Sequence, residues 1–312
     1  MTTFGIALIT ALTRKLTHFE NEGRMQQIKK QIGFIGAGNM AEAMIGAVLG
    51  AGMVAPENLF ISDPDEKRKE QLQSAYGLQT TSGNKELVFQ CDIVIFAVKP
   101  QVIASVLQEL ADGRAFAEPS GRRLFISIAA GIPLARIEEF VYAQKTDAEI
   151  RNMPVLRVMP NTPALVGAGM SGLCANRYAR AADMEIARAL LSAMGRVMVV
   201  NEEQMDAVTA LSGSGPAYAF YLLEAMIEAG RQLGLQADAA SDLAQSAVSG
   251  ALSLIRARNE DPAALRSKVT SPGGTTEAAI ELLDRREVRQ AIVSAVIAAA
   301  QRSRQLSQPG ND

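Results

Sequence analysis

A glycine-rich turn between an apolar strand and an Ala-rich helix is the feature that most limits how this chain can fold. Gln31–Ile35 is predicted as a strand, and Gly36-Ala37-Gly38-Asn39-Met40-Ala41 then turns into the helix. In such a turn Gly36 permits the tight bend, Gly38 lets the backbone approach a phosphate, and the small Ala41 lets helix and strand pack closely. Because a helix N-terminus attracts anions, this context favours a dinucleotide site over an ordinary glycine-rich turn.

The remainder of the first 200 residues continues this alternation of strands and helices. Further strands are predicted at Asn58–Ser62, Asp92–Val98, Leu124–Ile128 and Leu156–Met159, with the charged helix Glu66–Tyr76 after the first of them. The run Asp92–Val98 reads as a buried parallel strand. We therefore predict an α/β, doubly wound Rossmann-type sheet over residues 29–200. The polar stretches Asp112–Arg123 and Gln144–Asn152 are expected to be surface loops.

The sequence after Val200 is rich in Ala, Leu, Glu and Arg, which indicates an all-α domain over residues 201–312. Helices are predicted at Ala217–Leu233, Ala237–Arg258, Pro262–Lys268, Thr275–Arg285 and Val288–Leu306. The segments Ala244–Leu254 and Ala291–Ala300 are apolar on more than one face, so they must be buried. A domain of this size cannot cover them alone, and we expect a homodimer or a higher homo-oligomer.

Asp63 closes the second predicted strand, where an acidic side chain binds the adenine-ribose hydroxyls of NAD and repels the 2′-phosphate of NADP. Lys67 and Arg68 follow one turn later and would offset that repulsion. An equally good interpretation makes Asp63 a helix N-cap before Pro64. Both NADPH and NADH therefore stay open as cofactors.

Two later strands end in segments that suit a cofactor cleft, because ligands of open α/β sheets bind at the carboxyl ends of strands. One is Ala97-Val98-Lys99-Pro100, and the other is Ser127-Ile128-Ala129-Ala130-Gly131, whose small side chains leave room for a nicotinamide riboside. Each alone is an ordinary strand-to-helix turn. At successive strand ends they favour a shared cleft.

Proton donors of the usual kinds are scarce in this sequence. The single histidine is His18, and neither Lys nor His occurs between Thr146 and Ser267. Reduction of a ketone needs a group that protonates the oxygen, whereas a protonated imine is already electrophilic and yields a neutral amine. The scarcity favours a C=N substrate, although the tyrosines 142, 178, 218 and 221 and Lys268 stay available.

The segment Val269–Thr276, with the sequence VTSPGGTT, opens a predicted helix. Two glycines and several hydroxyl side chains at a helix N-terminus make a nest for a small carboxylate. Taken alone, these residues are explained better by an ordinary N-cap after a Pro-Gly turn.

Composition sets the remaining expectations. The formal net charge is −2 with no basic stripe, no apolar run is long enough for a membrane span, and the two cysteines suit a reducing compartment. We therefore expect a cytoplasmic protein that binds neither nucleic acid nor membrane and holds no metal. Residues 1–28 are expected to be an extension of doubtful role, and Met25 is a candidate start of the chain.

Taken together, the motifs resemble the pyrroline-5-carboxylate reductase family. The matching segments are Gly33–Met40 (GFIGAGNM), Ala97–Pro100 (AVKP), Ser127–Gly131 (SIAAG), Arg157–Leu165 (RVMPNTPAL), Asp206–Tyr218 (DAVTALSGSGPAY) and Thr270–Ala278 (TSPGGTTEA). The resemblance implies a Rossmann domain followed by a helical dimerisation domain. It also implies reduction of 1-pyrroline-5-carboxylate to L-proline, the last step of proline biosynthesis, by hydride transfer from NADPH or NADH to a cyclic imine.

The resemblance also implies site residues. It assigns the cofactor to Ile35, Gly36, Ala37, Gly38, Asn39, Met40, Asp63, Asn84, Ala97, Val98, Lys99, Pro100, Ala129 and Ala130. It assigns the substrate carboxylate to Ser271, Gly273, Gly274 and Thr275, and the ring nitrogen to the catalytic Thr276. The segment Met159–Thr162 would border the nicotinamide. Asp63-Pro64 departs from the Ser or Asn-Arg pair that many members carry for the 2′-phosphate, which leaves the preference for NADPH open.

Two other functions compete with this one. A β-hydroxyacid dehydrogenase would share the fold and the cofactor end, but it needs a helical Lys followed by an Asn four residues later, and this chain has no Lys in the corresponding stretch. A non-enzymatic NAD(P) sensor would have no need of the SPGGTT loop at a helix N-terminus.

Overall fold

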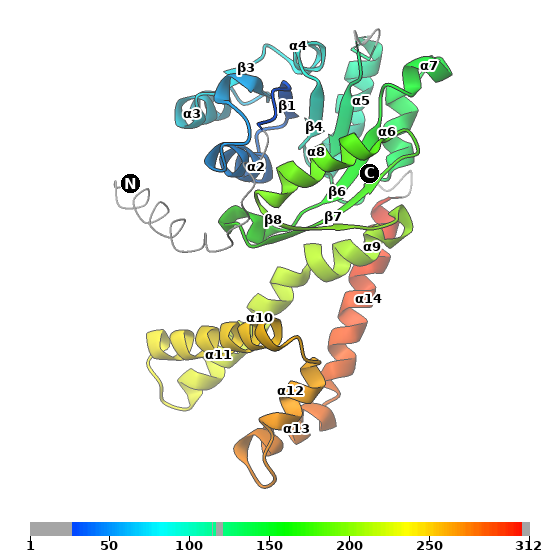
Figure 1. Cartoon of the computed structure of the whole chain (residues 1–312). Helices are drawn as coiled ribbons and strands as arrows, with labels where there is room; N and C mark the ends of the chain where they lie inside the picture. Colours follow the sequence, from blue (N-terminus) through cyan, green and yellow to red (C-terminus); the bar gives the residue numbers. More distant parts are fainter. Residues whose placement is uncertain (1–26, 114, 117–120, 308–312) are drawn as a thin grey trace.

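The computed structural model describes residues 27–113, 115–116 and 121–307, so the expectations for the extension and His18 lie outside the described residues, except at residues 27 and 28. The described chain forms a layered α/β part and an elongated helical part (Figure 1). One sheet has the strand order β3-β2-β1-β4-β5-β6-β7-β8. Its strands are β1 (Ile32–Ile35), β2 (Leu59–Ser62), β3 (Gln79–Thr80), β4 (Ile93–Phe96), β5 (Leu124–Ser127), β6 (Val155–Met159), β7 (Gly169–Ala175) and β8 (Gly195–Val199).

The sheet confirms the doubly wound prediction for strands β1 to β6, all of which pair in parallel. The expected strand ends are off by one or two residues. At β7 the prediction was incomplete: this strand runs antiparallel to β6 and then pairs in parallel with β8. The strands β3, β7 and β8 were not predicted from the sequence. The glycines of β7 weaken its strand signal, and pairing on both sides supplies what its local sequence lacks.

The helices of the α/β part cover both faces of the sheet. Their bounds are α2 (Asn39–Gly50), α3 (Glu66–Tyr76), α4 (Asn84–Gln90), α5 (Pro100–Asp112), α6 (Leu134–Val141), α7 (Asp147–Ile150) and α8 (Ala181–Ser192). Short 3₁₀ turns lie at Pro56–Asn58, Thr162–Val166 and Glu202–Gln204. Alternate residues of β4 enter opposite cores, Ile93 and Ile95 with α2 and α8, and Val94 and Phe96 with α5 and α6. Burial on both faces explains why this strand is apolar throughout.

Two loop predictions were wrong in part. The stretch 144–152 contains α7, which begins with a capping box in which the Thr146 side chain accepts from the Glu149 N–H and the Glu149 side chain accepts from the Thr146 N–H. The stretch 112–123 is not all surface, because Ala115, Phe116 and Arg123 are buried. Phe116 packs edge-on against Phe125 of β5, so apolar contact holds this connection against the sheet.

The helical part follows the sheet. It contains α9 (Met205–Val208), a π-helical turn (Thr209–Gly213), α10 (Gly215–Gln232), α11 (Ala237–Arg258), α12 (Pro262–Lys268), α13 (Thr275–Arg285) and α14 (Val288–Leu306). α10 packs along α11, while α14 returns to α9 and the π-helical turn beside the sheet (Figure 1). In the part of the chain that the structure describes, no helix is long and apolar enough to cross a membrane.

The helices predicted to need a partner leave apolar side chains uncovered. Leu243 and Leu252 of α11 and Ile292 and Ile297 of α14 are at least half exposed. Exposed apolar surface of this extent marks an interaction surface in a folded protein. The single chain therefore does not bury its own helical faces.

Candidate active site

The predicted dinucleotide turn has the backbone that its glycines require. Gly36 has a φ of +99°, and a Cβ there would lie 2.8 Å from the carbonyl oxygen of Ala97. Its N–H donates to the Ser62 carbonyl at 2.8 Å, which joins the turn to the end of β2. Gly38 precedes α2 in an extended conformation with no side-chain cap, and a Cβ there would meet nothing within 4 Å. The N-terminus of α2 is thus open to an anion, and Ala41 is fully buried against the core, as predicted.

Asp63 holds this turn from the neighbouring strand. One carboxylate oxygen accepts the N–H of Ala37 at 2.8 Å, and the other accepts the N–H of Asp65 at 2.9 Å. The alternative that made Asp63 the N-cap of the next helix is wrong, because Asp65 caps α3 by accepting the Arg68 N–H. Asp63 therefore holds the predicted dinucleotide turn and places a carboxylate beside it.

Arg68 contacts the same turn, and the residues that bind its guanidinium were not predicted from the sequence. Its Nε donates to the Ala37 carbonyl at 2.7 Å, and its Nη2 pairs with the carboxylate of Glu42 in α2. The Glu42 carboxylate also accepts from the Tyr76 hydroxyl at 3.4 Å. Burial, followed by the charge and hydrogen bond of Glu42, raises the pKa of Tyr76. The Arg68 guanidinium therefore binds the Glu42 carboxylate and the Ala37 carbonyl of its own chain. No local sequence motif predicts these two contacts.

The remaining predicted cofactor residues lie at adjacent strand ends. Ala97 donates its N–H to the Ile35 carbonyl at 2.8 Å, and Lys99 and Pro100 follow as the N-cap and first residue of α5. Asn84 accepts from the Ser62 hydroxyl at 2.8 Å and donates to Glu109 at 3.0 Å. The loop after β5 is tied to β4 by the hydrogen bond from the Ile128 N–H to the Phe96 carbonyl.

The segment after β6 contacts the helical part. Asn161 donates to the carbonyl and hydroxyl of Ser212 at 3.2 and 3.3 Å and accepts the N–H of Met170 at 2.9 Å. A Cβ at Gly213 would lie 2.4 Å from the Met159 methyl group, so this glycine permits close packing. The π-helical turn, a form that often occurs at functional sites, therefore borders the segment expected beside the nicotinamide.

The predicted substrate loop is open to solvent and lies before α13. Gly273 has a φ of +71°, and its N–H donates to the Glu277 carboxylate at 2.7 Å. Gly274 occupies the N-cap position, and no side chain caps α13. The alternative of a side-chain N-cap is therefore wrong, and the hydroxyls of Thr275 and Thr276 have no hydrogen-bond partner among the described residues. The nest already accommodates a carboxylate from its own chain.

Within one chain, the two groups of predicted residues do not come together. The cofactor residues lie at the carboxyl ends of β1, β2, β4 and β5, whereas the loop before α13 lies at the end of the helical part that points away from the sheet (Figure 1). A site that contains both groups of residues therefore needs one of the groups to come from a second chain.

Three of the five alternative proton donors already have partners, whereas the Tyr178 hydroxyl accepts from Arg177 and Tyr221 is exposed. Tyr142 donates to the Met153 carbonyl at 2.7 Å, and burial raises its pKa far above the usual value. Tyr218 donates to the Ala210 carbonyl at 3.0 Å, and Lys268 forms an ion pair with Glu260. A tyrosine proton donor therefore stays open at Tyr178 and Tyr221.

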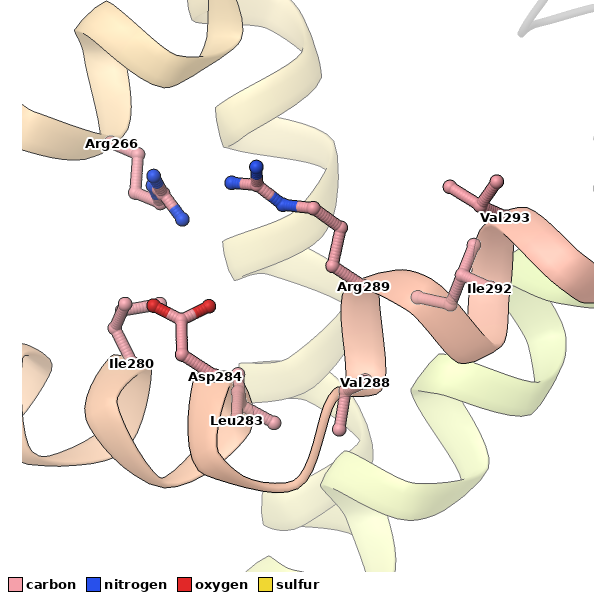
Figure 2. Close-up of a pocket in the computed structure, with 8 residues that line it drawn as sticks. All are labelled: Arg266, Ile280, Leu283, Asp284, Val288, Arg289, Ile292 and Val293. Atoms are coloured by element: carbon pink, nitrogen blue, oxygen red, sulfur yellow. The ribbon is translucent and has the colours of Figure 1, made fainter.

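A cavity of about 280 Å³ lies between α12, α13 and α14 and contains none of the predicted site residues. Figure 2 shows the Asp284 carboxylate and the guanidinium groups of Arg266 and Arg289 turned toward the same space, beside apolar side chains that include Ile280 and Leu283. Ile292 and Val293 line it and are also exposed. The cavity is continuous with the uncovered faces of the helical part, not with the cofactor turn.

The turn before α2 is open to an anion, Asp63 holds that turn, and a set of helices follows the sheet. These features define a Rossmann-type dinucleotide-binding protein with a helical second domain. The model described as pyrroline-5-carboxylate reductase dimerisation matches residues 202–306, and the one described as NADP oxidoreductase, coenzyme F420-dependent, matches residues 31–131. A pyrroline-5-carboxylate reductase of Synechocystis is 40% identical over 88% of this chain and 98% of its own. One of Pseudomonas aeruginosa is 41% identical over 89% and 97%.

A solved structure gives the same result. The Plasmodium falciparum pyrroline carboxylate reductase with NADP bound is 29% identical and has a TM-score of 0.79 over 90% of this chain and all of that one. The chain belongs to the pyrroline-5-carboxylate reductase family. This confirms the resemblance found in the sequence and the predicted order of a Rossmann domain and a helical dimerisation domain. The dimerisation domain indicates a homo-oligomer.

Proposed function

We propose that this protein reduces 1-pyrroline-5-carboxylate to L-proline with NADPH or NADH, as the last step of proline biosynthesis in the cytoplasm. The observation that carries the proposal is the loop before α13. Its Gly273 N–H is bonded to a carboxylate, while the Thr276 hydroxyl is left without a partner among the described residues. A cyclic imine with a carboxylate on the ring needs both features. The relatives of this chain are pyrroline-5-carboxylate reductases, and a substrate of that kind has both a ring nitrogen and a carboxylate.

We assign a separate role to each of the domains predicted from the sequence. Residues 29–200 hold the cofactor, residues 201–312 hold the substrate and assemble subunits, and residues 1–28 precede both. The two cysteines are free and buried, with burial raising the pKa of each thiol to about 12, which suits a reducing compartment.

The residues at the cofactor turn fit a dinucleotide. Gly38 leaves space that a side chain would fill, and the N–H groups at the start of α2 face it without a cap. The pyrophosphate would be held by Gly36–Met40, the adenine ribose by Asp63 and Asn84, and the nicotinamide end by Ala97–Pro100, Ala129 and Ala130. When bound, the reduced nicotinamide supplies the hydride.

The substrate would be held by the loop before α13. Its carboxylate would accept from the N–H groups of Gly273 and Gly274 and from the hydroxyls of Ser271 and Thr275. To bind there it must displace Glu277, whose carboxylate now bonds to Gly273. Thr276 would hydrogen-bond the ring nitrogen, because a neutral hydroxyl orients an imine or gives it a proton without acting as a strong base.

We further propose that each site is shared between two subunits, since one chain keeps its loop away from its own cofactor turn. The exposed apolar faces of α11 and α14 would be covered by the same assembly. A dimer is sufficient for this arrangement, because a two-fold interface supplies each cofactor turn with the other chain's loop.

Mixing two strongly impaired variants tests the shared site. Gly38→Val fills open space, so it should block the cofactor without disturbing the fold, and Thr276→Ala removes the reacting hydroxyl. Heterodimers would hold one intact site made of the Thr276→Ala cofactor turn and the Gly38→Val loop. Co-refolded mixtures should regain about a quarter of wild-type activity, because about half of the dimers are mixed and each has one intact site. Activity equal to the mean of the separate variants would contradict the shared site.

A further inference from the structure

The segment Ala129–Leu134 connects β5 to α6 and carries two of the residues assigned to the nicotinamide end of the cofactor. Ala129 and Leu134 are buried in the core beside α5 and α6, and the Ala129 N–H donates to the Ser127 hydroxyl at 3.3 Å. At Gly131 the backbone enters the left-handed region with a φ of +76°. Between these two buried side chains, the Gly131 carbonyl is contacted by a residue from outside the sheet.

The C-terminal end of α14 supplies one such contact. The Ser307 hydroxyl donates to the Gly131 carbonyl at 2.6 Å and lies 3.0 Å from the Ser303 carbonyl, so the shorter contact is with the segment. A Cβ at Gly131 would lie 3.4 Å from the Leu306 Cβ, which shows that helix and segment touch directly. The two are 176 residues apart in the sequence.

α14 is itself fixed at this end. The buried Ser303 hydroxyl donates to the Asp206 carboxylate at 2.7 Å, and Arg304 pairs with the other oxygen of Asp206 at 3.5 Å. Asp206 lies in α9, at the entry to the helical part. The end of α14 is thus anchored to α9 and does not move independently of it.

Glu202, in the 3₁₀ turn before α9, contacts the other end of the segment. Its carboxylate accepts the N–H of Leu134, the first residue of α6, at 2.6 Å. The same oxygen lies 3.4 Å from Nη1 of Arg157 in β6, whose side chain is buried. The segment is therefore held at Gly131 and at Leu134 by residues from the stretch 202–307, and the dimerisation model matches 202–306 of that stretch.

We propose that Ser307 and Glu202 are positioning residues that fix the segment Ala129–Leu134, so that binding of the nicotinamide end depends on the docking of α14 and of the turn before α9. This rests on the proposed function, which assigns Ala129 and Ala130 to the cofactor. The adenine half of the cofactor does not need these contacts, because it is assigned to β1, β2 and α4.

Comparing NADH with ADP-ribose isolates the contribution of the nicotinamide end, because ADP-ribose keeps the adenine half and lacks nicotinamide. Calorimetric titration of the full chain would use Ser307→Ala and Glu202→Ala. Loss of one hydrogen bond predicts roughly two- to tenfold weaker NADH binding in each, with ADP-ribose binding unchanged. Ser307→Thr keeps the hydroxyl and should restore NADH affinity. Ser192→Ala, which removes an equivalent bond to the Arg188 carbonyl on α8, should change neither ligand.

Sedimentation of each variant should give the wild-type mass, so that any weakened binding is not a loss of assembly. Unchanged NADH affinity in both Ser307→Ala and Glu202→Ala would overturn the proposal. Equal weakening of NADH and ADP-ribose would also overturn it, because the effect would then not be specific to the nicotinamide end. A wild-type protein that binds NADH but does not turn over pyrroline-5-carboxylate would overturn the proposed function instead.

Discussion

Replacing Asp63 by Asn tests what the carboxylate beside the cofactor turn does. Asn keeps one oxygen that accepts the Ala37 N–H, so the contact that holds the turn should survive, while the negative charge and the second bond, from the Asp65 N–H, are lost. Arg68 pairs with Glu42 and the Ala37 carbonyl, and Asp63 forms no ion pair among the described residues. The variant should therefore bind NADPH better, relative to NADH, than the wild-type protein does.

The magnitude follows from the half-buried position of Asp63. Two like charges ~5 Å apart repel by ~0.8 kcal/mol in water and by ~3 kcal/mol at an effective dielectric constant of ~20. We take an intermediate value of about 1–2 kcal/mol for a partly exposed carboxylate facing a 2′-phosphate. This corresponds to a roughly five- to thirtyfold rise in the ratio of kcat/KM for NADPH to that for NADH.

The assay measures kcat/KM for both cofactors at saturating pyrroline-5-carboxylate. Asp65→Asn is the matched control, because it removes the same charge two residues away and keeps a good N-cap on α3. An unchanged ratio in Asp63→Asn, or an equal change in Asp65→Asn, would refute the argument. Asp63→Ser should shift the ratio in the same direction but weaken both cofactors, since it also gives up the bond to Ala37.

Three further predictions follow from the site and the assembly. Thr276→Ala should lower kcat/KM for pyrroline-5-carboxylate about ten- to a hundredfold with cofactor affinity and Tm little changed, and wild-type kcat/KM would show that the hydroxyl has no catalytic role. Sedimentation at micromolar concentration should give a dimer or a larger oligomer, and a stable folded monomer would contradict the need to cover Ile292 and Ile297. Burial alone would raise the pKa of Asp183, but hydrogen bonds from Arg122 and the Arg180 N–H, with the charges of both arginines, lower it below its usual value. The contribution of the ionised Asp183 to stability is therefore complete above the unfolded pKa of about 3.9 and is lost as pH falls through the lower folded pKa. Asp183→Asn should lower Tm by roughly 2–6 °C at pH 7 and by less near pH 3. An equal loss of Tm at both pH values would contradict this role of Asp183.

Features that depend on local backbone or on pattern could be predicted from the sequence. Gly36 signals a positive φ, the apolar run of β4 signals a strand buried on both faces, and Gly274 followed by Thr275 signals the start of α13. The capping box of α7 was also legible as Thr146 followed by Glu149, but a polar composition led to the prediction of a loop.

Features that depend on distant partners could not be predicted. Asp63 and Asp65 flank Pro64 and are equivalent as caps in the sequence, and only the position of Ala37 decides between them. The bond from Ser307 to Gly131 joins residues that share no motif. The same limit applies to the shared site, because the sequence places the loop and the cofactor turn on one chain and does not show that the fold separates them.

The most direct test of the whole account is addition of 1-pyrroline-5-carboxylate to the purified protein with NADPH or NADH. We predict that the reduced cofactor is oxidised and that L-proline forms in equal amount, with at least one of the two cofactors. A protein that binds NADPH or NADH but leaves it reduced in the presence of pyrroline-5-carboxylate would contradict the assigned reaction.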